Sequence, residues 1–192
     1  MPDQIVPCTY FEKTGPQNSE KTIALAQARA EALDIEHIVV ASTSGKTGAM
    51  AAEMLSKCYH VVVVSHSTGF NNPNQQQLES EYRERIEATT ADILTCQHAL
   101  GGIGRAVRRK LGTYQLEEIM AFTLRNFCQG IKVVCEITIM ATDAGLMPAG
   151  EEIIAIGGTG RGADTAAVIL STNAQDFFDL RVLEILCKPR CW

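Results

Sequence analysis

The strongest structural signal in this sequence lies in residues 37–48, H-I-V-V-A-S-T-S-G-K-T-G. The apolar run at residues 38–41 predicts a buried parallel strand. Small hydroxylated residues and a glycine follow, and an alanine-rich helical pattern begins directly after them. Such a junction brings free backbone N–H groups and the positive end of a helix dipole to one point, so we expect it to bind a phosphate or another small anion. The residues of this predicted anion site are Ser42, Thr43, Ser44, Gly45, Lys46 and Thr47.

Two other interpretations of this junction follow from its residues. The S-G-K-T sequence invites comparison with a Walker A motif, but the first glycine of that motif is replaced here by Val40. A nucleotide triphosphatase is therefore not expected. The second interpretation, a helix that Ser42 or Ser44 simply caps, stays open.

Apolar runs alternate with helical patterns along the rest of the chain, and no linker or repeat divides it. We predict a three-layer α/β/α sandwich in a single domain, residues 1–192, with a mostly parallel sheet and an antiparallel strand near the C-terminus. The strands are expected at residues 5–10, 37–41, 59–65, 92–96, 132–142, 152–157, 163–170 and 181–188. The helices are expected after the capping residues Asn18 and Ser19, and at residues 48–57, 78–88, 100–111 and 116–128.

Composition excludes several classes of protein. Hydrophobic residues make up 46% and charged residues 20% of the 192 residues, as in an ordinary soluble domain. The net charge of −5 argues against a nucleic-acid partner. The short basic cluster at Arg105, Arg108, Arg109 and Lys110 is expected to be a solvated helix face.

No apolar run reaches the ~18 residues of a membrane span, and residues 1–7 lack the pattern of a signal peptide. We therefore expect a cytoplasmic protein with no membrane partner. The 7 cysteines are scattered without a C-x-x-C pair, so no metal site is expected.

A second glycine-rich segment, residues 158–163, reads G-T-G-R-G-A and formally matches a dinucleotide-binding fingerprint. That fingerprint requires a helix after the glycines, whereas D-T-A-A-V-I-L predicts a strand. We expect residues 158–162, called the Gly/Arg loop below, to offer backbone N–H groups and Arg161 to an anion. A purely structural turn is the alternative.

Further candidate residues follow the ends of predicted strands, where ligands bind in open α/β sheets. His66 and His98 are candidate acids or bases near neutral pH. Glu136 lies within an apolar run and Asp143 at its end. Thr68, Gly69 and Phe70 belong to a long polar loop, and Phe70 could stack on a planar ring.

Two of these segments together resemble the C-terminal domain of pyruvate kinases. One is the strand and hydroxyl loop that ends in S-T-S-G-K-T. The other, residues 145–170, is G-L-M-P-A-G-E-E-I-I-A-I-G-G-T-G-R-G-A-D-T-A-A-V-I-L. The whole chain is similar to small free-standing archaeal and bacterial proteins described as pyruvate kinase C-terminal-domain-like. The segments that carry this similarity are V-V-A-S-T, C-E-I-T-I-M-A-T-D and G-G-T-G-R-G-A-D-T.

The resemblance implies two half-sites for one anionic ligand. In pyruvate kinases this domain holds a regulatory sugar bisphosphate, with one phosphate at the hydroxyl loop and the other near the Gly/Arg loop. The second half-site would comprise Gly158, Thr159, Arg161 and Gly162. The family's tryptophan near that arginine is absent here, which implies a more open pocket and a flatter ligand. Flavin mononucleotide (FMN) is linked with the free-standing group.

We therefore predict a protein that binds a phosphorylated small molecule, with FMN as the expected cofactor. The phosphate would lie at the predicted anion site, and the rest of the ligand near Thr68, Gly69, Phe70 and the Gly/Arg loop. The alternative is a flavin- or metabolite-dependent enzyme, either an oxidoreductase or a catalyst of proton transfer through His66, His98, Glu136 or Asp143. A third alternative is a structural subunit whose apolar helix at residues 116–128 packs against a partner, and we expect the protein to form a homo-oligomer.

Overall fold

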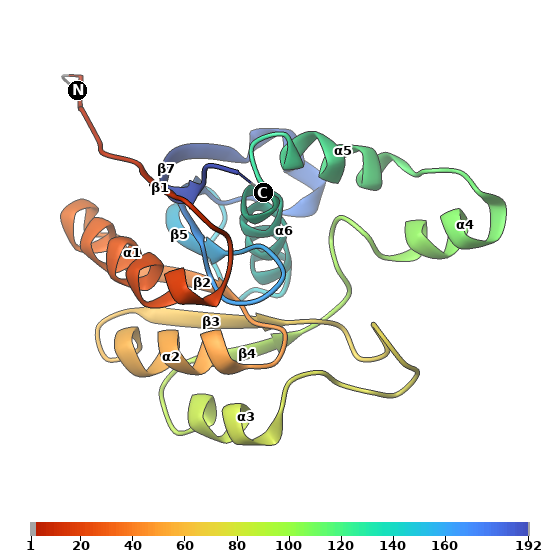
Figure 1. The fold of residues 1–192 in the computed structure, drawn as a ribbon, viewed down its shortest axis with the longest axis horizontal. Helices are drawn as coiled ribbons and strands as arrows, with labels where there is room; N and C mark the ends of the chain where they lie inside the picture. Colours follow the sequence, from red (N-terminus) through yellow and green to blue (C-terminus); the bar gives the residue numbers. More distant parts are fainter. Residues whose placement is uncertain (1–2, 192) are drawn as a thin grey trace.

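The computed structural model describes residues 3–191, which build one seven-stranded sheet in the order β1-β7-β6-β5-β2-β3-β4 (Figure 1). The strands are β1 (Thr9–Phe11), β2 (His37–Ala41), β3 (His60–Ser65), β4 (Asp92–Thr95), β5 (Glu152–Gly157), β6 (Thr165–Leu170) and β7 (Arg181–Pro189). The helices are α1 (Ser19–Leu33), α2 (Lys46–Leu55), α3 (Ser80–Glu87), α4 (Ile103–Leu111), α5 (Leu116–Arg125) and α6 (Gln129–Asp143). Two 3-10 turns, η1 (Pro16–Asn18) and η2 (Ala174–Asp179), complete the fold.

The sheet is mixed, as predicted. β6 runs antiparallel to both of its neighbours, β5 and β7, whereas the pairings of β1 with β7, β5 with β2, β2 with β3 and β3 with β4 are parallel. β2 therefore lies in the middle of the parallel part, between β5 and β3. The carboxyl ends of β2 and β3 meet at the same edge of the sheet, and this edge carries the site described below.

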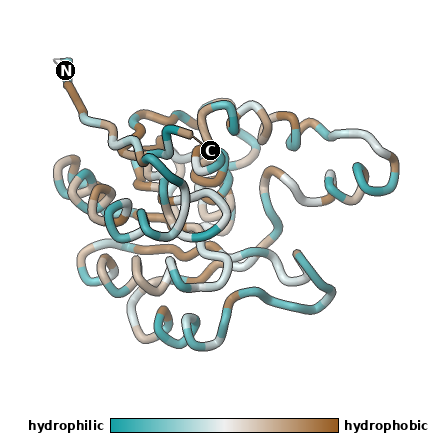
Figure 2. Tube along the Cα trace, in the orientation of Figure 1, coloured by the Kyte–Doolittle hydropathy of each residue, from teal (hydrophilic) through white to brown (hydrophobic). Residues whose placement is uncertain are grey.

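Helices cover both faces of the sheet, which confirms the three-layer α/β/α prediction. Alternate strand residues point to opposite faces, so Ile38 and Val40 pack under α1, α2 and α3, whereas Val39 and Val62 pack against α6. α5 packs on the outer side of α6. Figure 2 shows that hydrophobic stretches gather along the central strands, whereas α3 is largely hydrophilic.

The strand predicted at residues 132–142 is wrong, because this segment lies within helix α6. The run is rich in β-branched residues and lacks a polar face, and those two properties favoured a strand. The helix has no regular polar face because the sheet covers one side and α5 and η2 pack against other parts of it. Its hydroxyls bond to the chain's own carbonyls: Thr138 donates to Val134 O at 2.8 Å and Thr142 donates to Thr138 O at 2.9 Å. Periodicity alone does not separate a buried strand from a buried helix.

The first predicted strand also differs from the structure. The pattern at residues 5–10 predicted it, but β1 comprises only Thr9–Phe11 at the edge of the sheet. None of the helices in residues 3–191 has the length and apolar character that crossing a bilayer requires.

Candidate functional site

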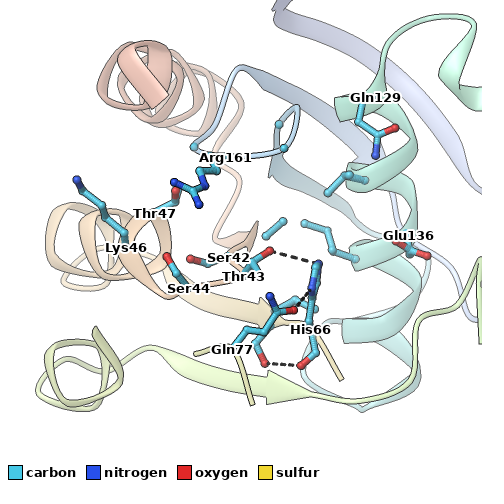
Figure 3. Close-up of a pocket in the computed structure, with 18 of the residues that line it drawn as sticks. Ser42, Thr43, Ser44, Lys46, Thr47, His66, Gln77, Gln129, Glu136 and Arg161 are labelled. Atoms are coloured by element: carbon cyan, nitrogen blue, oxygen red, sulfur yellow. Dashed lines mark hydrogen bonds between the residues drawn. The ribbon is translucent and has the colours of Figure 1, made fainter. Parts of the chain in front are cut away.

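A cavity of about 970 Å³ lies at the carboxyl ends of β2 and β3 (Figure 3). Its walls come from segments far apart in the sequence: the loop after β2, the end of β3, the loop before α3, helices α4 and α6, and the loop between β5 and β6. In an open α/β sheet, this edge is where ligands bind.

The loop between β2 and α2 forms one end of the cavity. Ser42 Oγ accepts a hydrogen bond from the Gly48 N–H at 2.9 Å, so this hydroxyl caps the helix. Gly45 adopts φ 102° at the start of α2, and a Cβ there would lie 2.5 Å from the Tyr82 Cβ. In the described chain, the N–H groups of Lys46 and Thr47 have no hydrogen-bond acceptor. These unpaired amides at a helix N-terminus can bind an anion.

The Gly/Arg loop between β5 and β6 is held by a fully buried carboxylate, that of Asp164. Asp164 Oδ2 accepts hydrogen bonds from the backbone N–H of Gly15 at 3.2 Å and of Thr159 at 3.3 Å. Asp164 Oδ1 accepts from the Thr165 hydroxyl at 3.0 Å and from the Thr159 hydroxyl at 3.4 Å. This network fixes the loop beside the N-terminal segment and presents Arg161 to the cavity (Figure 3).

His66 lies at the end of β3 and connects two loops. Its Nε2 atom is 3.2 Å from Thr43 Oγ1, and its Nδ1 atom is 2.9 Å from Gln77 Oε1 (Figure 3). Burial lowers the pKa of the His66 imidazole, and the hydrogen bond with Gln77 offsets this effect only in part. The neutral imidazole is therefore the form present at neutral pH.

Phe70 packs among three cavity residues. Its ring centroid lies 4.2 Å from that of His66 and 5.0 Å from that of His98, and the Arg105 guanidinium lies 4.6 Å from the Phe70 centroid. The ring is therefore already stacked in this structure. A planar ligand would have to share or replace one of these contacts.

The deep end of the cavity contains a buried ion pair on α6, between Lys132 and Glu136. Burial lowers the pKa of the Lys132 ammonium, although the Glu136 charge opposes this effect. Burial raises the pKa of the Glu136 carboxyl, but hydrogen bonds from His98 and Lys132 and the positive charge of Lys132 outweigh it and bring the pKa to about 2. Glu136 Oε1 also accepts from the Leu100 N–H at 3.1 Å.

One polar atom at this end has no hydrogen-bond partner within residues 3–191. His98 is 9% exposed, and its Nδ1 atom faces Glu136 Oε2 at 3.5 Å, but its Nε2 atom is buried and unpaired. A buried polar atom without a partner costs free energy unless a ligand or water completes it.

The structure brings most of the predicted site residues together around the cavity. Those that line it are Ser42, Thr43, Ser44, Lys46, Thr47, Phe70, Gly158, Arg161 and Gly162, together with His66, His98 and Glu136. Gly45 shapes the loop, and Thr68, Gly69 and Thr159 are not among the lining residues. Asp143 lies elsewhere, where its carboxylate accepts from the Asn173 side chain and the Ala174 N–H, each at 3.0 Å.

The cavity residues that sequence analysis missed include the polar side chains of Gln77, Arg125, Gln129 and Lys132. Sequence analysis was also wrong about Arg105, which was expected on a solvated face and instead lies half-buried over Phe70. The spacing of Lys132 and Glu136, four residues apart in an apolar run, was the signal available for a buried helical ion pair.

Comparisons with known proteins assign the chain to a family. The family described as pyruvate kinase, alpha/beta domain, matches residues 20–169. A crystal structure of a pyruvate kinase from Cryptosporidium parvum also matches. The match covers 78% of this chain and 22% of the pyruvate kinase chain, with 11% sequence identity and a TM-score of 0.40. Because the family match spans most of the 192 residues, this chain belongs to the pyruvate kinase α/β-domain family.

Proposed function

We propose that this protein binds a small molecule by its phosphate group, at the loop between β2 and α2. The unpaired amides of Lys46 and Thr47 at the start of α2 are the observation that carries this proposal. The hydroxyls of Ser44 and Thr47 line the same end of the cavity and add neutral donors. Arg161 reaches the cavity from the facing loop (Figure 3).

The charges around the cavity support an anionic ligand. The charged lining residues are Lys46, Arg105, Arg125, Lys132 and Arg161, against Glu79 and Glu136. The cavity is thus rich in cations, although the chain carries a net charge of −5. A concave site lined by one sign of charge concentrates ligands of the opposite sign.

FMN is the ligand that we propose for this cavity. A volume of about 970 Å³ is of the size that holds a small molecule with an extended ring system. Phe70 and the two histidines that it contacts offer aromatic surface to the flavin ring. Mass spectrometry of small molecules released from the purified protein would test this directly. A yellow protein that bleaches with NADH or NADPH would identify a flavin oxidoreductase, the second candidate function.

The double variant Ser44→Ala/Thr47→Ala is expected to bind FMN roughly a hundredfold more weakly than the wild type. Two hydrogen bonds to a charged phosphate would be lost, at about 1.5 kcal/mol each. Neither hydroxyl has a hydrogen-bond partner within the described residues, so the melting temperature should hardly change. Isothermal titration with FMN and with inorganic phosphate measures the effect. The control is Ser80→Ala/Thr113→Ala, whose two side chains are exposed outside the cavity. Equal affinity of both double variants would remove the site assignment.

We also propose that the protein self-associates through α4 and α5. The apolar side chains exposed there are Ile103, Leu111, Tyr114, Leu116, Ile119, Phe122 and Phe127. Figure 1 shows α4 at the far end of the molecule, away from the sheet. Exposed apolar surface of this kind is typical of a protein interface.

Light scattering after size-exclusion chromatography tests this proposal. The wild type is expected to have a mass above 20.9 kDa, the mass of one chain. Leu116→Glu/Phe122→Glu would place two carboxylates in the interface and should shift the protein to a monomer. Phe178→Glu changes an exposed aromatic residue elsewhere and should leave the mass unchanged. A monomeric wild type would contradict the proposal.

A further inference from the structure

We propose that Thr43, His66 and Gln77 form a catalytic group that transfers the phosphoryl group of a bound phosphate monoester to the Thr43 hydroxyl and then to water. The inference rests on the proposed function, because it needs a phosphate at the loop between β2 and α2. It adds a reaction, a nucleophile and a base to that binding site.

The three side chains form a continuous hydrogen-bonded chain. Thr43 Oγ1 lies 3.2 Å from His66 Nε2, and Gln77 Oε1 lies 2.9 Å from His66 Nδ1 (Figure 3). An amide oxygen only accepts hydrogen bonds, so the imidazole proton is assigned to Nδ1. Nε2 then carries a lone pair, and the Thr43 hydroxyl donates to it. This is the arrangement of an activated nucleophile: a hydroxyl lies within hydrogen-bond reach of a base, and a third group orients that base.

The surroundings of His66 keep the imidazole neutral. The titratable and charged groups that face it are His98, Arg105 on α4 and Glu136 on α6. Burial is the main cause of its lowered pKa. His98 and Arg105 act in the same direction, whereas the hydrogen bond with Gln77 and the charge of Glu136 oppose it only in part. A neutral imidazole can accept the Thr43 proton at neutral pH, as a general base must.

Thr43 belongs to the same loop as the free amides. It lies three residues before Lys46 and lines the same cavity, and we place the phosphorus of a phosphate bound to the Lys46 and Thr47 N–H groups next to the Thr43 hydroxyl. Amides, Lys46 and Arg161 would stabilise the charge that develops on the phosphoryl oxygens.

An independent observation indicates that a ligand completes this cavity. His98 lines the cavity, nine-tenths of it is buried, and its Nε2 atom has no partner in the part of the chain that the structure describes. Its ring centroid lies 5.0 Å from that of His66. A hydroxyl of the ester's alcohol group could donate to this atom.

The proposed reaction has two balanced steps. In the first, Thr43 Oγ1 attacks phosphorus and passes its proton to His66 Nε2, while the bond from phosphorus to the ester oxygen breaks. The leaving oxygen takes that proton and departs as an alcohol, which leaves phosphothreonine. In the second, water attacks phosphorus and gives a proton to His66 Nε2, and the bond from phosphorus to Thr43 Oγ1 breaks. His66 returns the proton to Thr43 Oγ1, and inorganic phosphate is released.

The test uses the full chain with p-nitrophenyl phosphate and with a sugar phosphate as substrates. Release of p-nitrophenol and of inorganic phosphate measures turnover, and acid quenching with a phosphorus-labelled substrate traps the phosphoenzyme. We expect an acid-stable label on Thr43 in the wild type. Thr43→Val should lose the label and at least about a hundredfold in turnover, whereas Thr43→Ser should keep both, with the label on serine. His66→Gln should lose about 10²- to 10⁴-fold in turnover.

Several outcomes would overturn the inference. One is a wild type that binds inorganic phosphate in a titration but neither turns over the esters nor carries label. Another is Thr43→Val with the turnover of the wild type. A third is an acid-labile label that survives in Thr43→Val and disappears in His66→Gln, since this would make His66 the nucleophile. A wild type that binds neither phosphate nor FMN would instead overturn the proposed function itself. Thr113→Ala, prepared in parallel, is the control for copurified phosphatases.

Discussion

Replacing Glu136 with alanine is expected to lower the free energy of unfolding by about 3–5 kcal/mol. The side chains of Lys132 and Glu136 are 5% and 4% exposed, so the variant would leave a buried ammonium without its counter-charge. The Leu100 N–H would also lose its acceptor. Urea unfolding at neutral pH measures the difference.

The control for this prediction removes both charges at once. Lys132→Met/Glu136→Leu replaces the pair with apolar side chains of similar size, and such replacements of buried pairs are often nearly neutral. The double variant also leaves the Leu100 N–H without its acceptor, but it leaves no buried charge, so it should be more stable than Glu136→Ala alone. A double variant as unstable as Glu136→Ala would contradict the explanation.

Acid should reduce the difference between the wild type and Glu136→Ala. The pKa of Glu136 falls from 4.5 to about 2 on folding, so its ionised form favours the folded state at higher pH. This contribution is complete above pH 4.5 and is lost as the pH falls through about 2. The two unfolding curves should thus converge in that window.

Replacing Asp164 with alanine is expected to cost about 2–4 kcal/mol of stability and to weaken phosphate binding. The change would leave the buried N–H group of Gly15 and the partly buried N–H group of Thr159 without their acceptor, and a buried group left unpaired costs ~1–3 kcal/mol. The Gly/Arg loop would lose its anchor, so Arg161 would no longer be held at the cavity. Thermal unfolding and a titration with FMN measure the two effects separately.

A matched control is Asp179→Ala. The Asp179 side chain is 78% exposed, and its contact with Arg181 is 3.9 Å long. Surface pairs of this kind contribute little, so this variant should unfold and bind as the wild type does. If Asp164→Ala were as stable as Asp179→Ala, the buried network would have no structural role.

The parts of the fold that sequence predicted are those with local signals. The apolar runs of β2 and β3 are bounded by hydroxyl and glycine residues, and the glycine loop before β6 marks another strand start. The predicted anion site follows from such a boundary, since α2 begins directly after Gly45. The sequence therefore located the edge of the sheet where the cavity forms.

The parts that it missed depend on tertiary packing. α6 is covered on several sides, so its residues carry no amphipathic period, and β-branched side chains gave it the appearance of a strand. Arg105 lies in a basic cluster, and only the fold shows that it points to Phe70 while Arg108 pairs with Glu118. Gln77 contacts His66 only because the long loop between β3 and α3 folds back toward the end of β3. No local pattern encodes these contacts.

The cavity walls come from stretches scattered between Pro16 and Gly162, and they converge only when the sheet is assembled. An unfolded chain therefore retains no version of the site, and any compound that occupies it draws the population toward the native state by mass action. A concentration a hundred times the dissociation constant would add about 2.7 kcal/mol. A rise in the melting temperature therefore reports that a compound is bound in the cavity. A collection of metabolites can be screened in this way before the reaction or the ligand is known.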